Sequence, residues 1–103
     1  MIIALITFKL PPNLAPADSE KRCLESAPRF RQLPGLIRKN YLYDPATGTG
    51  GGSYLWESRA AAEAFYNAAW LERMRATLGN TPTVQYFESP VQVDNVAGTI
   101  TTA

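Results

Sequence analysis

Six aromatic side chains fall in segments with strand character, and their types and spacing suit the recognition of a planar molecule. They are Tyr41, Tyr43, Tyr54, Trp56, Tyr86 and Phe87. A buried tyrosine hydroxyl needs a hydrogen-bond partner, so several converging tyrosines could orient a phenol, a quinol or a similar planar ligand. Packing alone also accounts for aromatic residues in a small core. Both interpretations, stacking on a planar guest and filling the core, apply to Trp56.

The other reactive residue types narrow the possible chemistry. The chain has no histidine, which removes the usual neutral-pH base, the usual proximal haem ligand and the imidazole ligands of most metal sites. The carboxylates form no ligand-spaced cluster, so we expect no metal site. The serines lie in no nucleophile elbow and have no histidine partner, which excludes a serine triad. Cys23 falls on the apolar side of an expected helix, as a buried, inert thiol would.

Size and charge exclude several classes of partner. Ten Lys and Arg residues against nine Asp and Glu leave a net charge of +1, which supplies no long-range field for nucleic acid or an anionic membrane. A chain of 103 residues is expected to form one domain. Its single cysteine leaves no disulfide framework and fits a cytoplasmic protein. The apolar N-terminal run is too short, and too closely followed by Pro11 and Pro12, to span a membrane.

The hydrophobic pattern predicts four strands and two helices. Residues 2–10 are apolar at odd and even positions, which is typical of a central strand covered on both faces. A first helix is expected from near Asp18; Pro28 interrupts it, and Ser26 could cap a restarted turn. The remaining expected elements are strands at about 36–43, from within 50–52 to 57, and at 83–89, and one helix at about 59–78. The packed stripe of this second helix is expected at Ala61, Ala64, Phe65, Ala68, Leu71 and Leu78, with Tyr66 and Trp70 beside it.

The order β-α-β-β-α-β predicts the ferredoxin-like α+β fold, a four-stranded antiparallel sheet of spatial order 4-1-3-2 with both helices on one face. The other face of the sheet is apolar along the first strand, so it has to be buried against another layer. A second copy of the same sheet would supply it with twofold symmetry and form a dimeric α+β barrel. Residues 1–90 make up this domain, and residues 91–103 are a C-terminal tail expected to pair across the dimer or to fray.

Side-chain parity decides which residues share a face of the sheet. One face of the third strand carries Gly52, Tyr54 and Trp56. On the second strand, one side carries Lys39, Tyr41 and Tyr43, and the opposite side carries Arg38 and Asn40. Parity alone leaves open which side of the second strand joins Tyr54 and Trp56.

Three runs of sequence, GLIRKNYLYD, GGGSYLWESRAAAEAF and VQYFESPVQVDN, resemble the YdhR-like mono-oxygenases. That family lies within the broader dimeric α+β barrel superfamily, which includes antibiotic-biosynthesis mono-oxygenases. The resemblance covers about residues 1–96 of the chain. It implies cofactor-independent oxygenation of a small aromatic molecule such as a phenol, quinol or anthrone, which loses a proton and passes an electron to dioxygen without metal or flavin.

The resemblance also implies roles for individual residues. It favours the Lys39 side of the second strand, with Arg38 and Asn40 in reserve. Lys39 and Tyr54 would be catalytic, because Lys39 could stabilise a phenolate or act as a base of lowered pKa. The substrate-binding residues would be Tyr41, Trp56 and Tyr86. Tyr54 and Tyr86 would hydrogen-bond oxygens of the substrate or of a peroxide intermediate, and Trp56 would stack on the ring.

Functions other than oxygenation also have to be considered. Haem-degrading relatives carry a helical histidine as iron ligand, and this chain lacks it, so the resemblance does not extend to haem cleavage. The alternative of a different class is a non-catalytic ligand-binding or stress-response dimer. An isomerase or lyase fits less well, because no carboxylate or histidine is placed to shuttle a proton.

Overall fold

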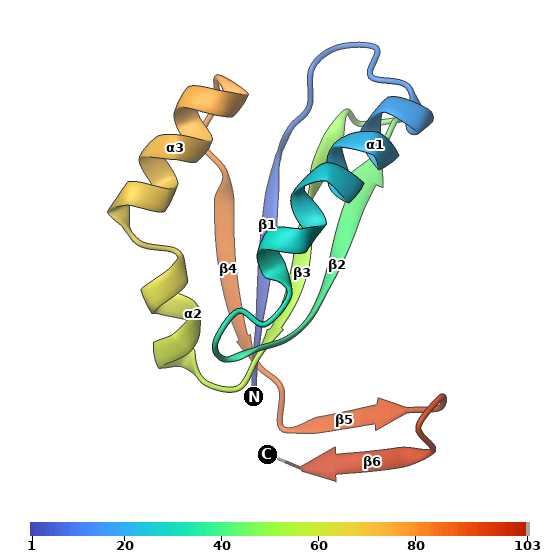
Figure 1. Ribbon diagram of the computed structural model, residues 1–103, viewed down its shortest axis with the longest axis vertical. Helices are drawn as coiled ribbons and strands as arrows, with labels where there is room; N and C mark the ends of the chain where they lie inside the picture. Colours follow the sequence, from blue (N-terminus) through green and yellow to red (C-terminus); the bar gives the residue numbers. More distant parts are fainter. Residues whose placement is uncertain (103) are drawn as a thin grey trace.

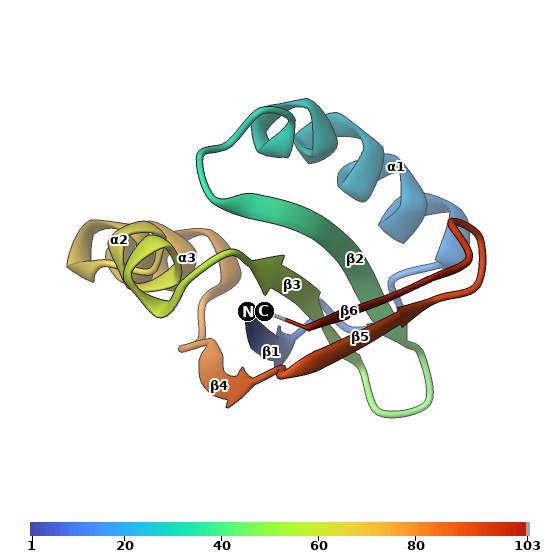
Figure 2. The same ribbon diagram turned by 90° about the horizontal axis from the view of Figure 1, so that it is seen from below.

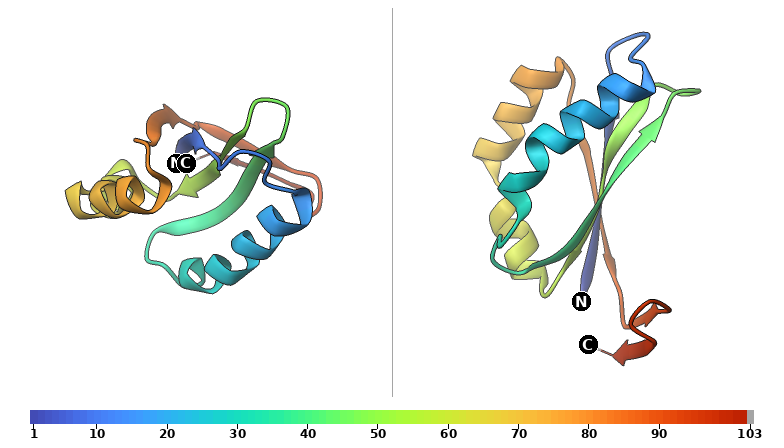
Figure 3. Two further views of the ribbon diagram at one scale, coloured as in Figure 1. Left: turned by 90° about the horizontal axis from the view of Figure 1, so that it is seen from above. Right: turned by 45° about the vertical axis from the view of Figure 1, so that its right-hand side comes forward.

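The protein has two layers, a four-stranded antiparallel sheet and a set of helices on one of its faces (Figures 1 and 3). The computed structural model describes residues 1–102. The sheet has the order β2-β3-β1-β4, so both the predicted ferredoxin-like fold and its strand order are confirmed. The strands are β1 (Ile2–Lys9), β2 (Leu36–Asp44), β3 (Thr49–Trp56) and β4 (Thr83–Glu88). The helices are α1 (Pro16–Ser26), the 3-10 helix η1 (Ala27–Phe30), α2 (Arg59–Phe65) and α3 (Ala68–Leu78).

Strand β1 lies in the middle of the sheet, between β3 and β4, as its apolar residues at both parities predict. Ile2, Ala4 and Ile6 are buried on the helix-covered face. Ile3 and Leu5 point to the opposite face, where they are partly exposed. We call this second side the open face; Phe87 of β4 lies on it, opposite Ile3, and is 51% exposed.

A close approach of two backbones explains one glycine of the GGG run. Gly51 has φ +151°, and a Cβ there would lie 1.8 Å from the carbonyl oxygen of Ile6 on the neighbouring β1. Any side chain at this position would push the two central strands apart. The run is therefore a strand-pairing feature, since Gly51 and Gly52 both lie within β3 and are buried.

The first helix starts two residues earlier than predicted, because Pro16 stands in its first turn, where a missing N–H is tolerated. Pro28 ends regular α-helix as expected, and the chain continues as η1. Ser26 precedes η1, but its hydroxyl does not cap that turn. It contacts the hydroxyl of Tyr41 on β2 instead, so the prediction of a capping role for Ser26 is wrong.

The predicted single helix at 59–78 is also wrong, because the chain forms two helices, α2 and α3. Asn67 interrupts the helix: it has extended backbone angles, and its side-chain oxygen accepts a hydrogen bond from the Trp70 backbone N–H at 2.9 Å. Such side-chain bonds compete with helix continuation and start a new helix instead. The break changes the packed stripe: Trp70 is buried, whereas Ala64 and Ala68 are exposed.

Residues 91–102 of the tail form a hairpin of their own, β5 (Val91–Asp94) paired with β6 (Thr99–Thr102), beyond the end of the main sheet (Figures 1 and 2). Ala103 lies outside the described residues, and fraying of the tail stays a prediction. Pairing of this tail with a partner subunit stays a prediction. None of the helices within residues 1–102 combines the length and the apolar character needed to cross a membrane.

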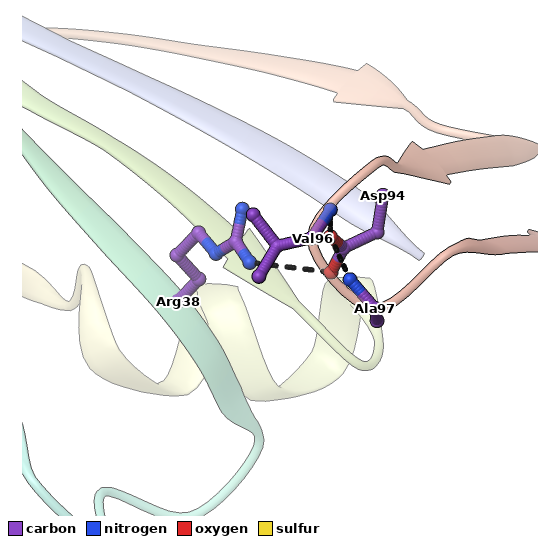
Figure 4. A network of polar contacts seen from close by, with 4 residues as sticks. All are labelled: Arg38, Asp94, Val96 and Ala97. Carbon is purple, nitrogen blue, oxygen red and sulfur yellow. Dashed lines mark hydrogen bonds and ion pairs between the residues drawn. The ribbon is translucent and has the colours of Figure 1, made fainter.

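Asp94 organises the hairpin turn and ties it to β2 (Figure 4). Its carboxylate accepts hydrogen bonds from the backbone N–H groups of Val96 and Ala97 at 2.9 and 3.0 Å and lies 3.6 Å from the Arg38 guanidinium. The backbone bonds from Ala97 and Val96, followed by the charge of Arg38, lower the pKa of Asp94. Since Arg38 is well exposed, this ion pair contributes little to stability.

Candidate functional site

The strand register brings the predicted residues of β2 and β3 to the helix-covered face. Lys39 pairs with Tyr54, and Tyr41 pairs with Gly52. A side chain at Gly52 would collide with the Tyr54 ring and with the Lys39 stem, so the glycine leaves room for both. The structure thus places Lys39 and Tyr41 beside Tyr54, the side of β2 that we favoured from sequence. The reserve residues, Arg38 and Asn40, are exposed.

The Lys39 amine lies among three aromatic rings. Its Nζ is 3.5 Å from the ring centre of Phe30, 3.9 Å from that of Tyr41 and 4.7 Å from that of Tyr54. It forms no ion pair or hydrogen bond with any residue of the described part of the chain. Burial lowers the pKa of Lys39 to about 7; Cys23 acts against this shift and the charge of Arg29 adds to it. The amine can therefore gain and lose a proton near neutral pH.

The hydroxyls of Tyr41 and Tyr43 are bound to structural partners. The Tyr41 hydroxyl lies 2.5 Å from Ser26 Oγ, and Tyr43 donates to the carbonyl oxygen of Leu14 at 2.6 Å. Burial raises the pKa of Tyr41, although its bond to Ser26 acts in the other direction. The first bond joins β2 to the last residue of α1 and holds the Tyr41 ring in position beside the Lys39 amine, and the second joins β2 to the loop before α1.

Tyr54 and Trp56 form the floor of the site. They are 5% and 0% exposed, and their rings stack at 6.2 Å with an angle of 11°. Trp56 Nε1 donates to the Tyr66 hydroxyl at 3.2 Å. Burial raises the pKa of Tyr54 far above its ordinary value, so its hydroxyl keeps its proton at neutral pH. The Trp56 indole fills the core of this single chain, and a planar guest would reach it only after Phe65 or Tyr66 moved aside.

These rings belong to a continuous group, which we call the aromatic cluster. It consists of Phe30, Tyr41, Tyr54, Trp56, Phe65, Tyr66, Trp70 and Tyr86. From sequence we expected Phe65 in the packed stripe of the second helix, with Tyr66 and Trp70 beside it, and Phe30 was not among the expected site residues. Two features of the sequence bear on the missed members of the cluster. Phe30 lies two residues after the helix-breaking Pro28, and Asn67, a residue type that caps helices, directly follows Tyr66, so both rings lie where a helix ends.

Tyr86 lies apart from Lys39, because β4 and β2 are the two edges of the sheet. Its ring contacts that of Tyr66 at 6.2 Å, and the Arg59 guanidinium lies over it at 4.7 Å. Burial is the main cause that raises the pKa of Tyr86, and the charge of Glu63 adds to it. The structure therefore brings together Lys39, Tyr41 and Tyr54 but connects Tyr86 to them only through other rings.

An open hollow of about 310 Å³ lies at the end of the sheet, and neither Tyr86 nor Lys39 lines it. Its walls are Met1, Ile2, Glu57, Ser58, Arg59, Glu88, Ser89 and Pro90. Both carboxylates and the guanidinium are exposed, so this hollow suits a planar apolar ligand less well than the aromatic cluster does. Within residues 1–102, no three cysteine, aspartate or glutamate side chains gather closely enough to hold a metal ion.

Several solved structures share the architecture of this chain. A "putative antibiotic biosynthesis monooxygenase" from Deinococcus radiodurans matches with a TM-score of 0.67 and 15% identity, over 91% of this chain and 97% of that one. The monooxygenase ActVA-Orf6 of Streptomyces coelicolor, solved with the ligand nanaomycin D, matches with a TM-score of 0.61 and 18% identity, over 85% and 86%. An MhuD variant with two manganese protoporphyrin IX molecules bound per active site matches with a TM-score of 0.65 and 20% identity, over 91% and 99%. The fold is that of the antibiotic-biosynthesis mono-oxygenase-like proteins.

The family model described as "Putative mono-oxygenase ydhR" matches residues 3–100. The chain therefore belongs to the YdhR mono-oxygenase family, and the resemblance seen in its sequence is confirmed. No curated protein matches it.

Proposed function

We propose that this protein is a cofactor-independent mono-oxygenase that acts on a small aromatic molecule such as a phenol, a quinol or an anthrone. Membership of a mono-oxygenase family supports the reaction class. The single observation that carries the finer proposal is the position of the Lys39 amine among three aromatic rings, where burial lowers its pKa to about 7. A planar substrate would lie at the partly exposed rim of the aromatic cluster, formed by Phe30, Tyr41 and Phe65.

The first step of the reaction is removal of a proton from the substrate by a base, and dioxygen acts as the oxidant afterwards. Neutral Lys39 would take the proton of a phenol and become an ammonium that stabilises the phenolate. The phenolate would pass one electron to dioxygen, and the resulting radical and superoxide would join in a carbon–oxygen bond. The peroxide anion would then take the Lys39 proton. Loss of water would convert the ring C–H to C=O, so that phenol and dioxygen yield a quinone and water.

The other residues would hold the reactants. The buried Tyr54 hydroxyl keeps its proton and can donate to an oxygen of the substrate or the peroxide. Tyr41 would support one side of the substrate ring. Contacts of Trp56 and Tyr86 with substrate stay predictions; they require the cluster to open at Tyr66, which separates the two rings.

Isotope labelling tests the oxygenation directly. Protein incubated with an anthrone or quinol under ¹⁸O₂ should release a quinone that carries one ¹⁸O atom, at a rate above that of protein-free buffer. Incubation with unlabelled dioxygen in H₂¹⁸O measures exchange of the product carbonyl with water. Saturable quenching of tryptophan fluorescence without labelled product would instead favour a non-catalytic ligand-binding protein.

We also propose that two copies pair through their open faces as a homodimer. Ile3, Leu5 and Phe87 expose apolar surface there, and exposed apolar surface of this kind marks interfaces. Light scattering with size-exclusion chromatography should give twice the mass of the 11.3 kDa chain. Phe87→Glu should yield monomers, because it places a charge in the interface, whereas Leu24→Glu on the outer side of α1 should not. A monomeric wild-type protein would contradict this assembly. A cytoplasmic location stays a prediction from cysteine content.

A further inference from the structure

The Lys39 amine differs from the other two lysines of the chain in its surroundings. Lys9 and Lys21 are exposed, whereas Lys39 lies among the rings of Phe30, Tyr41 and Tyr54 without a counter-ion in the described residues. We propose that Lys39 is a nucleophile that captures an aromatic aldehyde or ketone as an imine. This activity goes beyond oxygenation, since it needs neither dioxygen nor an oxidisable ligand.

Burial is the largest cause that lowers the pKa of Lys39, so it favours the reactive neutral amine. Cys23 of α1 and Arg29 of η1 are the charged or titratable neighbours that act on it, with Tyr41 and Tyr54 on the strands beneath. Arg29 lowers the pKa of Lys39, because its charge repels an ammonium, whereas Cys23 raises it. With its pKa lowered from 10.5 to about 7, Lys39 is neutral in about half of the protein molecules at pH 7. The neutral fraction of an ordinary lysine at this pH is about 0.03%.

The rings act in the opposite direction and make the proposal testable. An aromatic face attracts an ammonium, so a site dominated by this attraction would store Lys39 in its charged, unreactive form. A site dominated by desolvation would hold the neutral amine. Because the three rings also present flat apolar faces, an aromatic carbonyl compound can stack beside them while its carbonyl carbon meets Nζ. The reactivity of Lys39 reports which effect dominates.

The chemistry is balanced without any oxidant. The Nζ lone pair attacks the carbonyl carbon, and the carbonyl oxygen takes a proton to give a carbinolamine. Loss of that hydroxyl with a proton from nitrogen releases one water and leaves the C=N bond. Lysine amines of lowered pKa are the usual nucleophiles in such imines.

Selective trapping tests the proposal. The full chain is incubated at pH 7 with salicylaldehyde and sodium cyanoborohydride, which reduces an imine to a stable secondary amine, and the labelled peptides are quantified by mass spectrometry. Lys39 should be modified at least about tenfold faster than Lys9 or Lys21, which serve as internal references. The α-amino group is scored separately in its own peptide. Equal or slower labelling of Lys39 would overturn the proposal and identify a stored ammonium.

A matched pair of variants tests the electrostatic cause. Cys23→Asp introduces a carboxylate near Lys39, which should favour the ammonium and slow labelling of Lys39 at pH 7 by about tenfold. Cys23→Ser changes size little and adds no charge, so labelling should stay within about twofold of wild type. Labelling of Lys9 and Lys21 should not change in either variant. An equal effect of both substitutions on Lys39 would contradict the electrostatic explanation.

The oxygenation proposal and the imine proposal for Lys39 can be refuted independently of each other. Labelling proceeds under nitrogen, so a protein that makes no ¹⁸O-labelled product can still trap the aldehyde at Lys39. Conversely, a protein that oxygenates quinols while Lys39 stays unlabelled would retain the oxygenase function and lose only the nucleophile.

Discussion

Replacing Trp56 by alanine is expected to lower the free energy of unfolding by about 3–5 kcal/mol, since removal of a fully buried large side chain leaves a cavity. The indole is 0% exposed, stacks on Tyr54 and packs against Phe65 and Tyr66. The alanine variant would also leave the Tyr66 hydroxyl without its donor. Since a domain of this size is stable by only about 5–15 kcal/mol, the loss is a large fraction of the total. Urea denaturation followed by far-UV circular dichroism measures it.

Two milder variants separate the contribution of the buried ring from that of the hydrogen bond between Trp56 and Tyr66. Trp56→Phe keeps an aromatic ring and should lose clearly less than the alanine variant, while Tyr66→Phe removes only the hydrogen bond and should lose about 1 kcal/mol. Fluorescence of the remaining Trp70 follows unfolding in the Trp56 variants. A loss below about 1 kcal/mol for Trp56→Ala would mean that the indole faces an opening and not a packed core, because only a site that collapses or fills with ligand avoids the cavity penalty.

Replacing Lys39 by methionine is expected to reduce oxygenation by about 10²–10⁴-fold, the range for loss of a general base. The wild-type rate should rise with pH through about 7, because only the neutral amine of Lys39 accepts the substrate proton. Oxygen uptake in the presence of a quinol, measured from pH 5.5 to 9, gives both results. A variant that keeps the same rate and the same pH profile would remove Lys39 from the reaction.

The Lys39→Met variant should gain stability at low pH although it loses activity. The folded-state pKa of Lys39 is lowered, so the unfolded chain binds more protons between about pH 7 and 10.5, and the wild type gains stability as pH rises through that window. Below pH 7 both states hold the proton, and folding must bury a charge. Lys39→Met should therefore be more stable than wild type at pH 6, by about 1 kcal/mol after allowance for partial exposure. The difference should shrink at pH 9. Joint loss of stability and activity would indicate a structural role.

The alternation of strands and helices was readable from the sequence because it depends on local patterns. Apolar residues at both parities placed β1 at the centre of the sheet, and right-handed connections then left one strand order. Parity also grouped Tyr54 with Trp56, and Lys39 with Tyr41, before any contact was known. Local hydrogen-bond chemistry was harder to read: Asn67 capped a new helix where hydrophobic spacing predicted a continuous one.

The sequence by itself therefore determined the order of the four main strands and which residues of a strand share a face, since these follow from periodicity and residue type. Its membership of the YdhR family rested on the resemblance of three runs of sequence and not on periodicity. Only the tertiary structure decided that β2 turns Lys39 toward Tyr54 and that three rings surround its amine. It also decided that Trp56 is fully buried and donates a hydrogen bond to Tyr66, the residue that follows α2. The physical reason is that desolvation and ring contacts depend on distances between segments far apart in sequence, which no local pattern specifies.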